Sequence, residues 1–423
     1  MGSRGKILIL VENLSVPFDK RVWREARALV EAGYGVSVIG PRGKTFDTAA
    51  REVLDGVAIY RYTSHEVSSG LWAYFGEFLE ALVKMTWLSL VVFFREGFHV
   101  IQLCNPPDLL FLVALPYTLL GRAIVFDQHD LSPETYLSKK PDHRPGLVYK
   151  LLLIFERLTF RAADVVVSTN ESYKQVAITR GRVPADRIVV VRNGPDLRSF
   201  VETARNPALR QGKPYLLFYL GIMGPQDGVD YLLRSVAYLI HEKGRGDFHL
   251  LLMGGGTELD ALKAYARELE VEGAVTFAGW VSDDGPILEG LSTADVCVCP
   301  DPKTPLNDRS TLVKTLEYMA LGKPMVCYDL IETRVSAGDA ALYAAANSER
   351  DFGDKIAQLL DDPGQREALG AAGRERIRRG LAWDHSKPRL YEAYRLAFKR
   401  AGRTNLVPSA SVGGVASPVD PKS

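Results

Sequence analysis

The chain has 423 residues, a length that suits two domains of about 200 residues each. Its 52 Lys and Arg balance 51 Asp and Glu, and a net charge of +1 argues against a protein that mainly binds nucleic acid. The 47% hydrophobic content excludes wholesale disorder, and four cysteines without a C-x-x-C pair favour a cytoplasmic protein without a zinc site or disulfide framework.

The first half alternates short apolar runs with helix-length amphipathic segments, which predicts a parallel sheet covered by helices on both faces. An N-terminal signal peptide is not expected, because Glu12 ends the first apolar run after a few residues. Residues 20–32 carry apolar side chains at helical spacing, and Gly33 is the expected end of that helix. The strand-like runs are 6–11, 35–40, 57–62, 98–103, 122–127, 164–169 and 187–192.

The most apolar stretch lies at 85–94, inside a longer aromatic-rich region at 71–96. A membrane-spanning helix needs about 20 apolar residues, so this stretch is too short to span. Two interpretations stay open: a long helix packed on the sheet, or a helix whose Trp and Phe side chains touch a bilayer surface. The second would suit a peripheral enzyme at the inner face of the membrane.

A polar segment near 196–213 precedes a second run of the same alternation. We therefore expect two Rossmann-like domains, 1–200 and 214–382, facing each other across a ligand-binding cleft. A last helix is expected within 383–402, and the Ser-, Pro- and Gly-rich tail at 403–423 is predicted to be disordered. The strand-like runs of the second half are 215–220, 248–254, 274–279, 295–299 and 324–328.

The segment 305–324 carries the densest polar pattern, with an expected helix that starts near Ser310. Free backbone N–H groups at Ser310 and Thr311 would bind an anion at that helix start. Lys314 would suit a diphosphate and Glu317 a ribose diol. The alternative is a capped surface helix with an i, i+3 ion pair.

His129 lies between Asp127 and Asp130, directly after the strand-like run at 122–127. An imidazole beside carboxylates can donate to a sugar hydroxyl or act as a base. A surface histidine with a structural partner is the alternative. The other histidines do not cluster with acids at metal-ligand spacing, so no protein-bound metal is predicted.

The segments that follow the predicted strands indicate which ligands could bind there. The segment 12–21 lacks a G-x-G-x-x-G pattern, which argues against an NAD or FAD enzyme. Glycines in 221–228, 254–256 and 279–281 would let the backbone approach a ligand closely, or would simply form tight turns.

Over about residues 6–400 the chain resembles the family 4 retaining glycosyltransferases of the GT-B fold, in particular those tied to surface polysaccharide assembly. Several separate motifs carry the resemblance and occur in the family's order. They lie at 16–29, 127–134, 192–196, 308–324 and 329–339.

The resemblance implies an α/β chain of two facing Rossmann-like domains with a C-terminal crossover helix. It implies transfer of a sugar from a nucleotide-sugar to a glycan or lipid-linked acceptor, with the anomeric configuration retained. His129 would contact the transferred sugar, Glu317 would hold the ribose as the second Glu of the E-x7-E motif, and Lys314 would lie near the diphosphate. Other donor-side residues would be Gly221, Met223, Gln226, Gly254, Trp280, Val281, Asp308, Ser310, Thr311 and Arg334; acceptor-side residues would be Asn13, Phe18, Asp19 and Arg21. No permanently bound cofactor and no metal are expected, and a UDP-sugar is favoured over a GDP- or dTDP-sugar.

The chain departs from the family pattern at three positions. Arg309 stands where the first Glu of E-x7-E belongs, with Asp308 one residue earlier, and the donor-phosphate cations of the family fall at Ile222 and Asp227. Two alternatives follow: a nucleotide-sugar epimerase with the GT-B fold, and a catalytically inactive scaffold.

Overall fold

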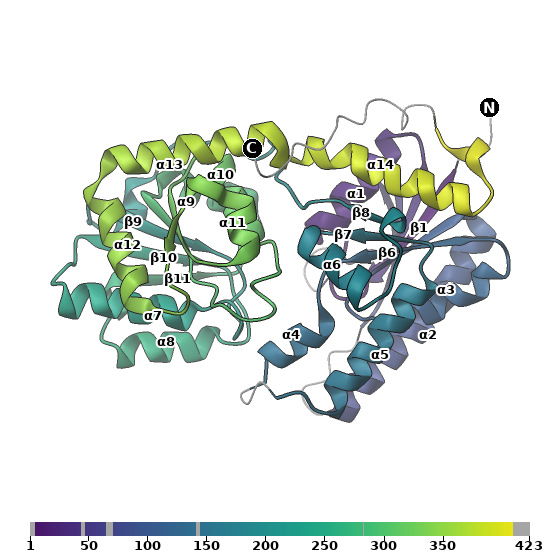
Figure 1. Cartoon of the computed structure of the whole chain (residues 1–423), viewed down its shortest axis with the longest axis horizontal. Helices are drawn as coiled ribbons and strands as arrows, with labels where there is room; N and C mark the ends of the chain where they lie inside the picture. The colour runs from purple at the N-terminus through teal and green to yellow at the C-terminus, as the bar shows by residue number, and fades with distance from the viewer. Residues whose placement is uncertain (1–4, 44–46, 65–70, 141–143, 282, 409–423) are drawn as a thin grey trace. The chain divides into compact units, whose positions relative to one another are not determined.

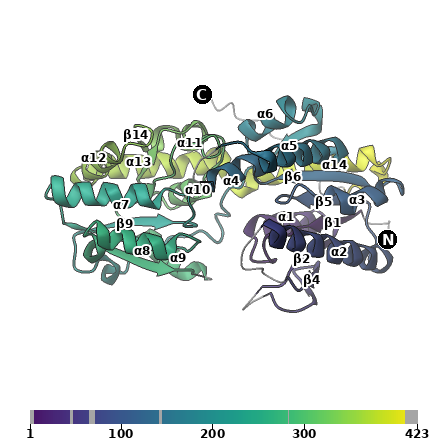
Figure 2. The same ribbon diagram turned by 90° about the horizontal axis from the view of Figure 1, so that it is seen from below.

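The computed structural model describes residues 5–43, 47–64, 71–140, 144–281 and 283–408. These form two compact units, each an α/β sandwich (Figures 1 and 2). The first consists mainly of the chain up to Tyr136, Arg144–Asn193 and the residues from Ser386; the second is mainly Gly194–His385.

The first unit is built on a sheet whose strand order is β3-β4-β2-β1-β5-β6-β7-β8. All of its strand pairs are parallel except β3 with β4, and β1 lies centrally, with Ile7 opposite both Val36 and Val100. Its strands are β1 (Lys6–Leu10), β2 (Gly35–Pro41), β3 (Arg51–Leu54), β4 (Val57–Tyr62), β5 (Val100–Cys104), β6 (Ala123–Gln128), β7 (Val165–Ser168) and β8 (Ile188–Val190).

Helices cover both faces of this sheet. One face packs against α2, α3, α5 and α6, and α14 lies beside α1, where the Tyr391 hydroxyl donates to the carbonyl of Ala28. The helices are α1 (Lys20–Glu31), α2 (Leu71–Arg95), α3 (Phe111–Thr118), α4 (Ser132–Ser138), α5 (Leu147–Ala162), α6 (Glu171–Thr179) and α14 (Trp383–Arg400). Within the described chain, no helix is both long enough and apolar enough to cross a membrane.

The second unit holds a six-stranded parallel sheet in the order β11-β10-β9-β12-β13-β14. Alternate residues of β9 enter different cores, Leu217 with α7, α8 and α12, and Phe218 with α9 and α10, because successive side chains of a strand point to opposite faces. The strands are β9 (Tyr215–Leu220), β10 (Phe248–Met253), β11 (Val275–Gly279), β12 (Val296–Cys299), β13 (Met325–Tyr328) and β14 (Leu342–Ala344); the helices are α7 (Val229–Ala237), α8 (Leu259–Glu268), α9 (Asp284–Thr293), α10 (Val313–Ala320), α11 (Ile331–Ala337), α12 (Glu349–Asp361) and α13 (Pro363–Arg376).

Two segments differ from the expectations. The polar segment near 196–213 belongs to the second unit, where the backbone N–H groups of Thr203 and Asn206 donate to hydroxyls of α9. Thr404–Leu406, expected to be disordered, forms a 3-10 turn with Leu406 buried. The rest of the predicted tail, residues 409–423, lies outside the described residues. The aromatic side chains at 72–75, which belong to the aromatic-rich region noted in the sequence, also lie outside them.

Candidate active site

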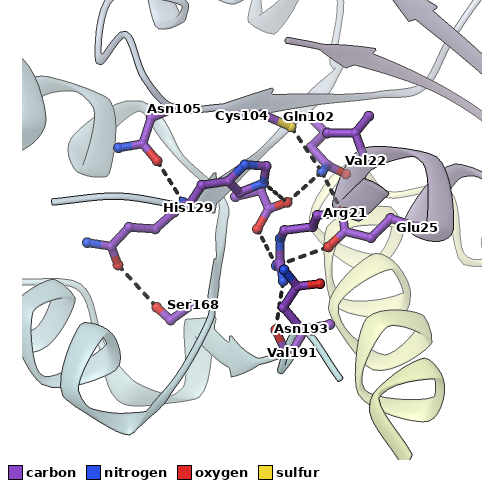
Figure 3. Close-up of polar contacts among 12 residues, drawn as sticks. Arg21, Val22, Glu25, Gln102, Cys104, Asn105, His129, Ser168, Val191 and Asn193 are labelled. Atoms are coloured by element: carbon purple, nitrogen blue, oxygen red, sulfur yellow. Dashed lines mark hydrogen bonds and ion pairs between the residues drawn. The ribbon is translucent and has the colours of Figure 1, made fainter. Parts of the chain in front are cut away.

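His129 follows the last residue of β6, at the carboxyl edge of the first sheet, where ligands bind in open α/β folds. Its Nε2 lies 2.7 Å from Oδ2 of Asp127. Its backbone N–H donates to Oδ1 of Asn105 at 2.7 Å, and the N–H of Asp130 donates to the same oxygen at 3.2 Å. Asn105 therefore fixes the loop that carries His129 (Figure 3), and Asp127 fixes the ring.

Asp127 is the buried centre of this cluster. Its carboxylate accepts hydrogen bonds from Arg21 at 2.8 Å and from Gln102 at 2.9 Å, besides its contact with His129. Burial alone would raise the pKa of Asp127, but Arg21 and His129 hold that pKa below its usual range. Asp127 is therefore ionised at neutral pH.

Arg21 and Glu25 come from α1, one turn apart, and both point into the cluster. The Arg21 guanidinium lies 3.0 Å from Glu25 and donates to the carbonyl of Val191 at 3.1 Å. Gln102 donates to Glu25 at 2.9 Å and accepts from the hydroxyl of Tyr394 on α14. Burial raises the pKa of Glu25 above its ordinary value, which Arg21 only partly offsets.

The electrostatics favour a protonated His129. Burial lowers the pKa of its imidazole, but the neighbouring Asp127 outweighs this and raises the pKa above its ordinary value. The side chain is 12% exposed, and its Nδ1 makes no hydrogen bond within the described part of the chain. A ring held at Nε2 can therefore present Nδ1 to a ligand as a donor, or as an acceptor when neutral.

Cys104, Asp127 and His129 offer three metal-type ligand atoms within 4.8 Å of one another. Two observations speak against a metal there. The Arg21 cation already occupies Asp127, and burial raises the pKa of the Cys104 thiol well above its ordinary value. A divalent ion would need a thiolate and would face a buried guanidinium, so the donor set does not fit.

The predicted acceptor-side residues have different environments. Asn13 is exposed in the loop after β1, and the backbone N–H of Phe18 donates to Asp47 at 3.2 Å. Asp19 is the N-cap of α1, accepting from the N–H groups of Arg21 and Val22. Arg21 is buried and bound to Asp127, so it supports His129 from inside the fold, contrary to its expected contact with an acceptor.

In the second unit, the loops after three neighbouring strands are joined backbone to backbone. The N–H of Met223 donates to the carbonyl of Gly255, and the N–H of Gly254 donates to that of Gly279. A Cβ on Gly254 would lie 1.8 Å from the carbonyl oxygen of Gly221, and Gly254 has a φ of +130°. Direct contact between these loops is therefore the main reason that glycine is required here, and this contact shapes the carboxyl edge of the sheet.

Trp280 follows β11 and lies over this glycine loop. A Cβ on Gly255 would approach its indole nitrogen to 2.5 Å, and its side chain is 64% exposed. Val281 packs against the core beneath. An exposed aromatic ring at this edge is available for stacking on a flat ligand.

Lys314 lies in the first turn of α10 and points toward the loop after β9. Its Nζ donates to both oxygens of Asp301 at 3.0 Å and lies 3.4 Å from the hydroxyl of Tyr219. Burial alone would lower the pKa of Lys314, but Asp301 and the neighbouring acids raise it well above its ordinary value. A Cβ on Gly221 would be 3.3 Å from Nζ, so the ammonium lies directly beside this loop.

Asp227 adds a second acid near Lys314. Its Oδ2 accepts from the N–H of Gly224 and from the side chain of Gln226, both at 3.0 Å. Burial raises the pKa of Asp227 to about 6, although Lys314 opposes the shift. The cationic residue of the family pattern is thus replaced by a carboxyl group that can be neutralised.

The segment before α10 corrects two expectations. The helix begins at Val313, and the N–H of Ser310 donates to the carbonyl of Leu306 at 3.1 Å, so this amide is not available to an anion. Asp308 accepts from the N–H of Ile331 at 2.9 Å and thereby caps α11. One of its two carboxylate oxygens is therefore already bound within the fold.

The remaining predicted donor-side residues lie on or near α10 and α11 and are partly exposed. Glu317 is partly exposed on α10, one turn after Lys314, and Thr311 is partly exposed before the helix. Arg334 forms a bidentate ion pair with Asp329 at 2.6 and 2.9 Å and stacks on Tyr343, so its cation is already paired.

Sequence reasoning missed several members of both clusters. These residues are buried, and they lie within a buried strand or helix or directly after a buried strand, where a polar side chain is unexpected. They are Asp301, Tyr219, Gln102, Asn105 and Glu25. A polar side chain inside an apolar strand, such as Gln102 within β5, is the signal that could have identified them.

Comparisons with known proteins agree with this architecture. The family described as "Glycosyl transferases group 1" matches residues 214–362, and the "Glycosyl transferase 4-like domain" matches 19–194. A D-inositol 3-phosphate glycosyltransferase of Thermomonospora curvata is 30% identical over 56% of this chain, and the match spans 58% of that relative. An O-antigen chain mannosyltransferase B of Escherichia coli is 26% identical over 67% of this chain and 72% of its own.

Solved structures share the fold. Sucrose-phosphate synthase of Thermosynechococcus elongatus superposes with a TM-score of 0.78 at 19% identity, covering 94% of this chain and all of that one. Anabaena HepE in complex with UDP-glucose gives a TM-score of 0.68 at 15% identity, covering 92% and 99% of the two chains.

Proposed function

Since the chain belongs to the family 4 type of glycosyltransferases with the GT-B fold, we propose that it transfers a sugar from a nucleotide-sugar to a glycan or lipid-linked acceptor in cell-surface polysaccharide or glycoconjugate assembly. The observation that carries the proposal is the position of Lys314. A buried ammonium beside the glycine loop after β9, in the first turn of a helix, is an arrangement that suits a diphosphate.

The donor would lie along the carboxyl edge of the second sheet. The N–H groups of the first turn of α10 and Lys314 would face the diphosphate, Glu317 would accept from the ribose hydroxyls, and Trp280 would lie against the base. Asp227 would be protonated when the diphosphate binds, because a second negative charge raises a carboxyl pKa further. UDP is favoured, since structures sharing this fold were solved with UDP or UDP-glucose.

The chemistry would retain the anomeric configuration. The bond between the anomeric carbon and the diphosphate oxygen breaks, the acceptor oxygen bonds to the same face of that carbon, and the acceptor proton passes to the departing diphosphate. His129, held by Asp127 and favoured in its charged form, would donate from Nδ1 to a hydroxyl of the transferred sugar. No residue of the chain has to form a covalent intermediate.

We also propose that the enzyme works without a metal or a permanently bound cofactor, in the cytoplasm, with residues 71–96 contributing a peripheral contact at the inner face of the membrane. Charge at the diphosphate would come from Lys314 and the start of α10. Chelation with EDTA should therefore leave the transfer rate unchanged, and a loss restored by Mg²⁺ would refute this part.

The test of function is release of nucleoside diphosphate from a panel of UDP-, GDP- and dTDP-sugars. Lys314→Met and Glu317→Gln should each lower kcat/KM by about a hundredfold or more, because the first removes the ammonium beside the proposed diphosphate loop and the second removes the charged acceptor of the ribose hydroxyls. Lys263→Met and Glu268→Gln change the same residue types on the exposed side of α8 and should be silent. Wild-type activity in both site variants would disprove the donor site.

The comparisons favour neither an epimerase nor an inactive scaffold. NMR of donor incubated without acceptor identifies an epimerase, which interconverts the donor sugars, whereas a transferase gives slow hydrolysis at most and a scaffold leaves them unchanged. Addition of acceptor then separates the last two, because only a transferase forms a glycosylated product. In the presence of acceptor, the anomeric proton of the first product formed reports retention directly.

A further inference from the structure

The outer surface of α2 carries a continuous stripe of exposed apolar side chains. They recur every three or four residues, which places them on one face of the helix. Trp87 and Phe94 are 66% and 83% exposed, values unusual for side chains of this size. The stripe consists of Leu79, Val83, Trp87, Leu90 and Phe94.

Two neighbouring helices extend this stripe into a broad surface. On the sheet face that α2 covers, α3 contacts α2 and α5 contacts α3 (Figure 1). Leu119 at the end of α3 is 89% exposed and Leu147 at the start of α5 is 74% exposed. The other exposed members are Leu112, Leu115 and Leu120 from the α3 region, and Leu151, Ile154 and Leu158 from α5. We call these residues and the α2 stripe the three-helix apolar face.

Soluble proteins rarely leave so many large apolar side chains together on one surface. A hollow of about 470 Å³ lies within the face, among Trp87, Leu90, Val91, Phe94 and Arg95. Some partner must therefore cover this surface, and the charges around it indicate which kind.

The exposed charges on this face are cations. Lys150, Arg157 and Arg161 lie on the same side of α5 as its apolar stripe, at helical spacing, and all three are exposed. The one acid of α5, Glu156, is buried and bound by Arg180 at 2.6 Å, and α3 carries no charge. On α2, Glu80 is paired with Lys84, and the helix ends on the exposed Arg95.

We propose that the three-helix apolar face docks on a lipid bilayer that contains anionic headgroups. The apolar stripes would enter the boundary between headgroups and acyl chains, and the cations would meet the lipid phosphates. A second copy of this chain fits less well, because a symmetric interface would bring the cations of α5 against the same apolar, positively charged face. The inference deepens the proposed membrane contact, since it extends the contact from α2 to α3 and α5, and it rests on the proposed function for its purpose, access to a lipid-linked acceptor.

Vesicle flotation tests this proposal. The full chain should bind vesicles of phosphatidylcholine mixed with phosphatidylglycerol, bind pure phosphatidylcholine more weakly, and dissociate from the mixture at high salt. Each cation near the surface contributes about a fivefold factor in affinity, so the triple variant Lys150→Gln, Arg157→Gln, Arg161→Gln should lose about a hundredfold.

A second variant tests the apolar part. Trp87→Gln, Phe94→Gln and Leu119→Gln together should abolish binding to both vesicle types, and they change only exposed side chains, so folding should be kept. Val201→Gln, which changes a half-exposed apolar residue of the second unit, outside the three-helix apolar face, is the control and should bind like wild type.

Three results would overturn the proposal: no wild-type binding to anionic vesicles, binding by both triple variants that equals that of the wild type, or a wild-type dimer in ultracentrifugation that the apolar variant converts to monomers. The last would identify a second copy as the occupant. Nucleoside diphosphate release with a soluble acceptor separates this from the proposed function, because both triple variants should keep that activity. Vesicle binding without any transfer would refute the function and leave the docking face standing.

Discussion

Replacing Asp127 by Asn removes one buried charge and leaves the shape of the side chain almost unchanged. In the wild type this carboxylate accepts from Arg21 at 2.8 Å and from Gln102 at 2.9 Å. The variant leaves a buried guanidinium with Glu25 as its remaining acidic partner at 3.0 Å. Removing one partner of a buried ion pair typically costs 3–5 kcal/mol, so Asp127→Asn should destabilise the first unit by about that amount.

Asp55→Asn is the matched control. It breaks the pair between Arg27 and Asp55, which are 3.2 Å apart but exposed on both sides, and it should cost less than about 1 kcal/mol. Because the two units need not unfold together, amide hydrogen exchange in β6 is the appropriate measure, since it follows the first unit alone.

The same variant should change the titration of His129. Loss of the adjacent carboxylate should lower the pKa of the imidazole, because Asp127 is the group that raises it; the shift is measured from the ring-proton NMR signals, which His129→Gln assigns. The stability effect has a defined pH dependence. The depressed pKa of Asp127 contributes stability above the unfolded pKa of about 4, and this is lost as the pH falls through the folded value, so wild type and variant should converge in acid.

This account of the cluster would be refuted if Asp127→Asn lowered the free energy of unfolding no more than Asp55→Asn does and also left the pKa of His129 unchanged. Asp127 would then be neither the support of Arg21 nor the group that charges the imidazole.

Three further predictions concern other groups. The raised pKa of Glu25 contributes stability that is complete below its unfolded pKa of about 4.5 and is lost as the pH rises through the folded value. Glu25→Gln should therefore flatten the fall in stability of the first unit between pH 5 and 8, measured by amide hydrogen exchange in β6. Asp227, with a pKa raised to about 6, should take up a proton when a diphosphate binds; donor affinity by calorimetry should weaken above pH 6, and Asp227→Asn should remove that dependence. Gly254→Ala should destabilise the second unit by about 3 kcal/mol or more, because its Cβ would overlap a carbonyl oxygen, whereas Gly244→Ala, also at positive φ but with open space around it, should cost about 1 kcal/mol; equal costs would contradict the loop contact.

Most strands of this fold were predictable from the sequence because both faces of each sheet are covered by helices. Central parallel strands such as β1 and β5 are buried along nearly their whole length, so they read as continuous apolar runs. The two strands that were missed lie at sheet edges and are short: β3 carries exposed Arg51, and β14 has three residues. An edge strand has only one neighbour and needs less apolar surface, so its sequence resembles a loop.

The candidate sites were predictable only where chemistry follows a strand end. His129 and Lys314 were identified because their neighbours in sequence carry the pattern. Asp127 was identified with His129 for the same reason, but its pairing with Arg21 was not, because the two residues meet across 106 positions. Asp301 was missed because it meets Lys314 across a loop and a helix start. The sequence shows where a polar residue stands, but it does not show which residue will be its partner. The partner depends on which strands lie side by side in the fold.

Helix α14 has a consequence for how the protein is made. From Ser386 onward it belongs to the first unit, and its Tyr394 binds Gln102 in β5. About 190 residues of the second unit must therefore leave the ribosome before the first unit receives its last helix. At roughly 5–20 residues per second this is a delay of about 10–40 s, during which the face of the first sheet beside α1 stays uncovered. The nascent chain is open to chaperones, and to aggregation, for longer than its parallel sheets alone would require.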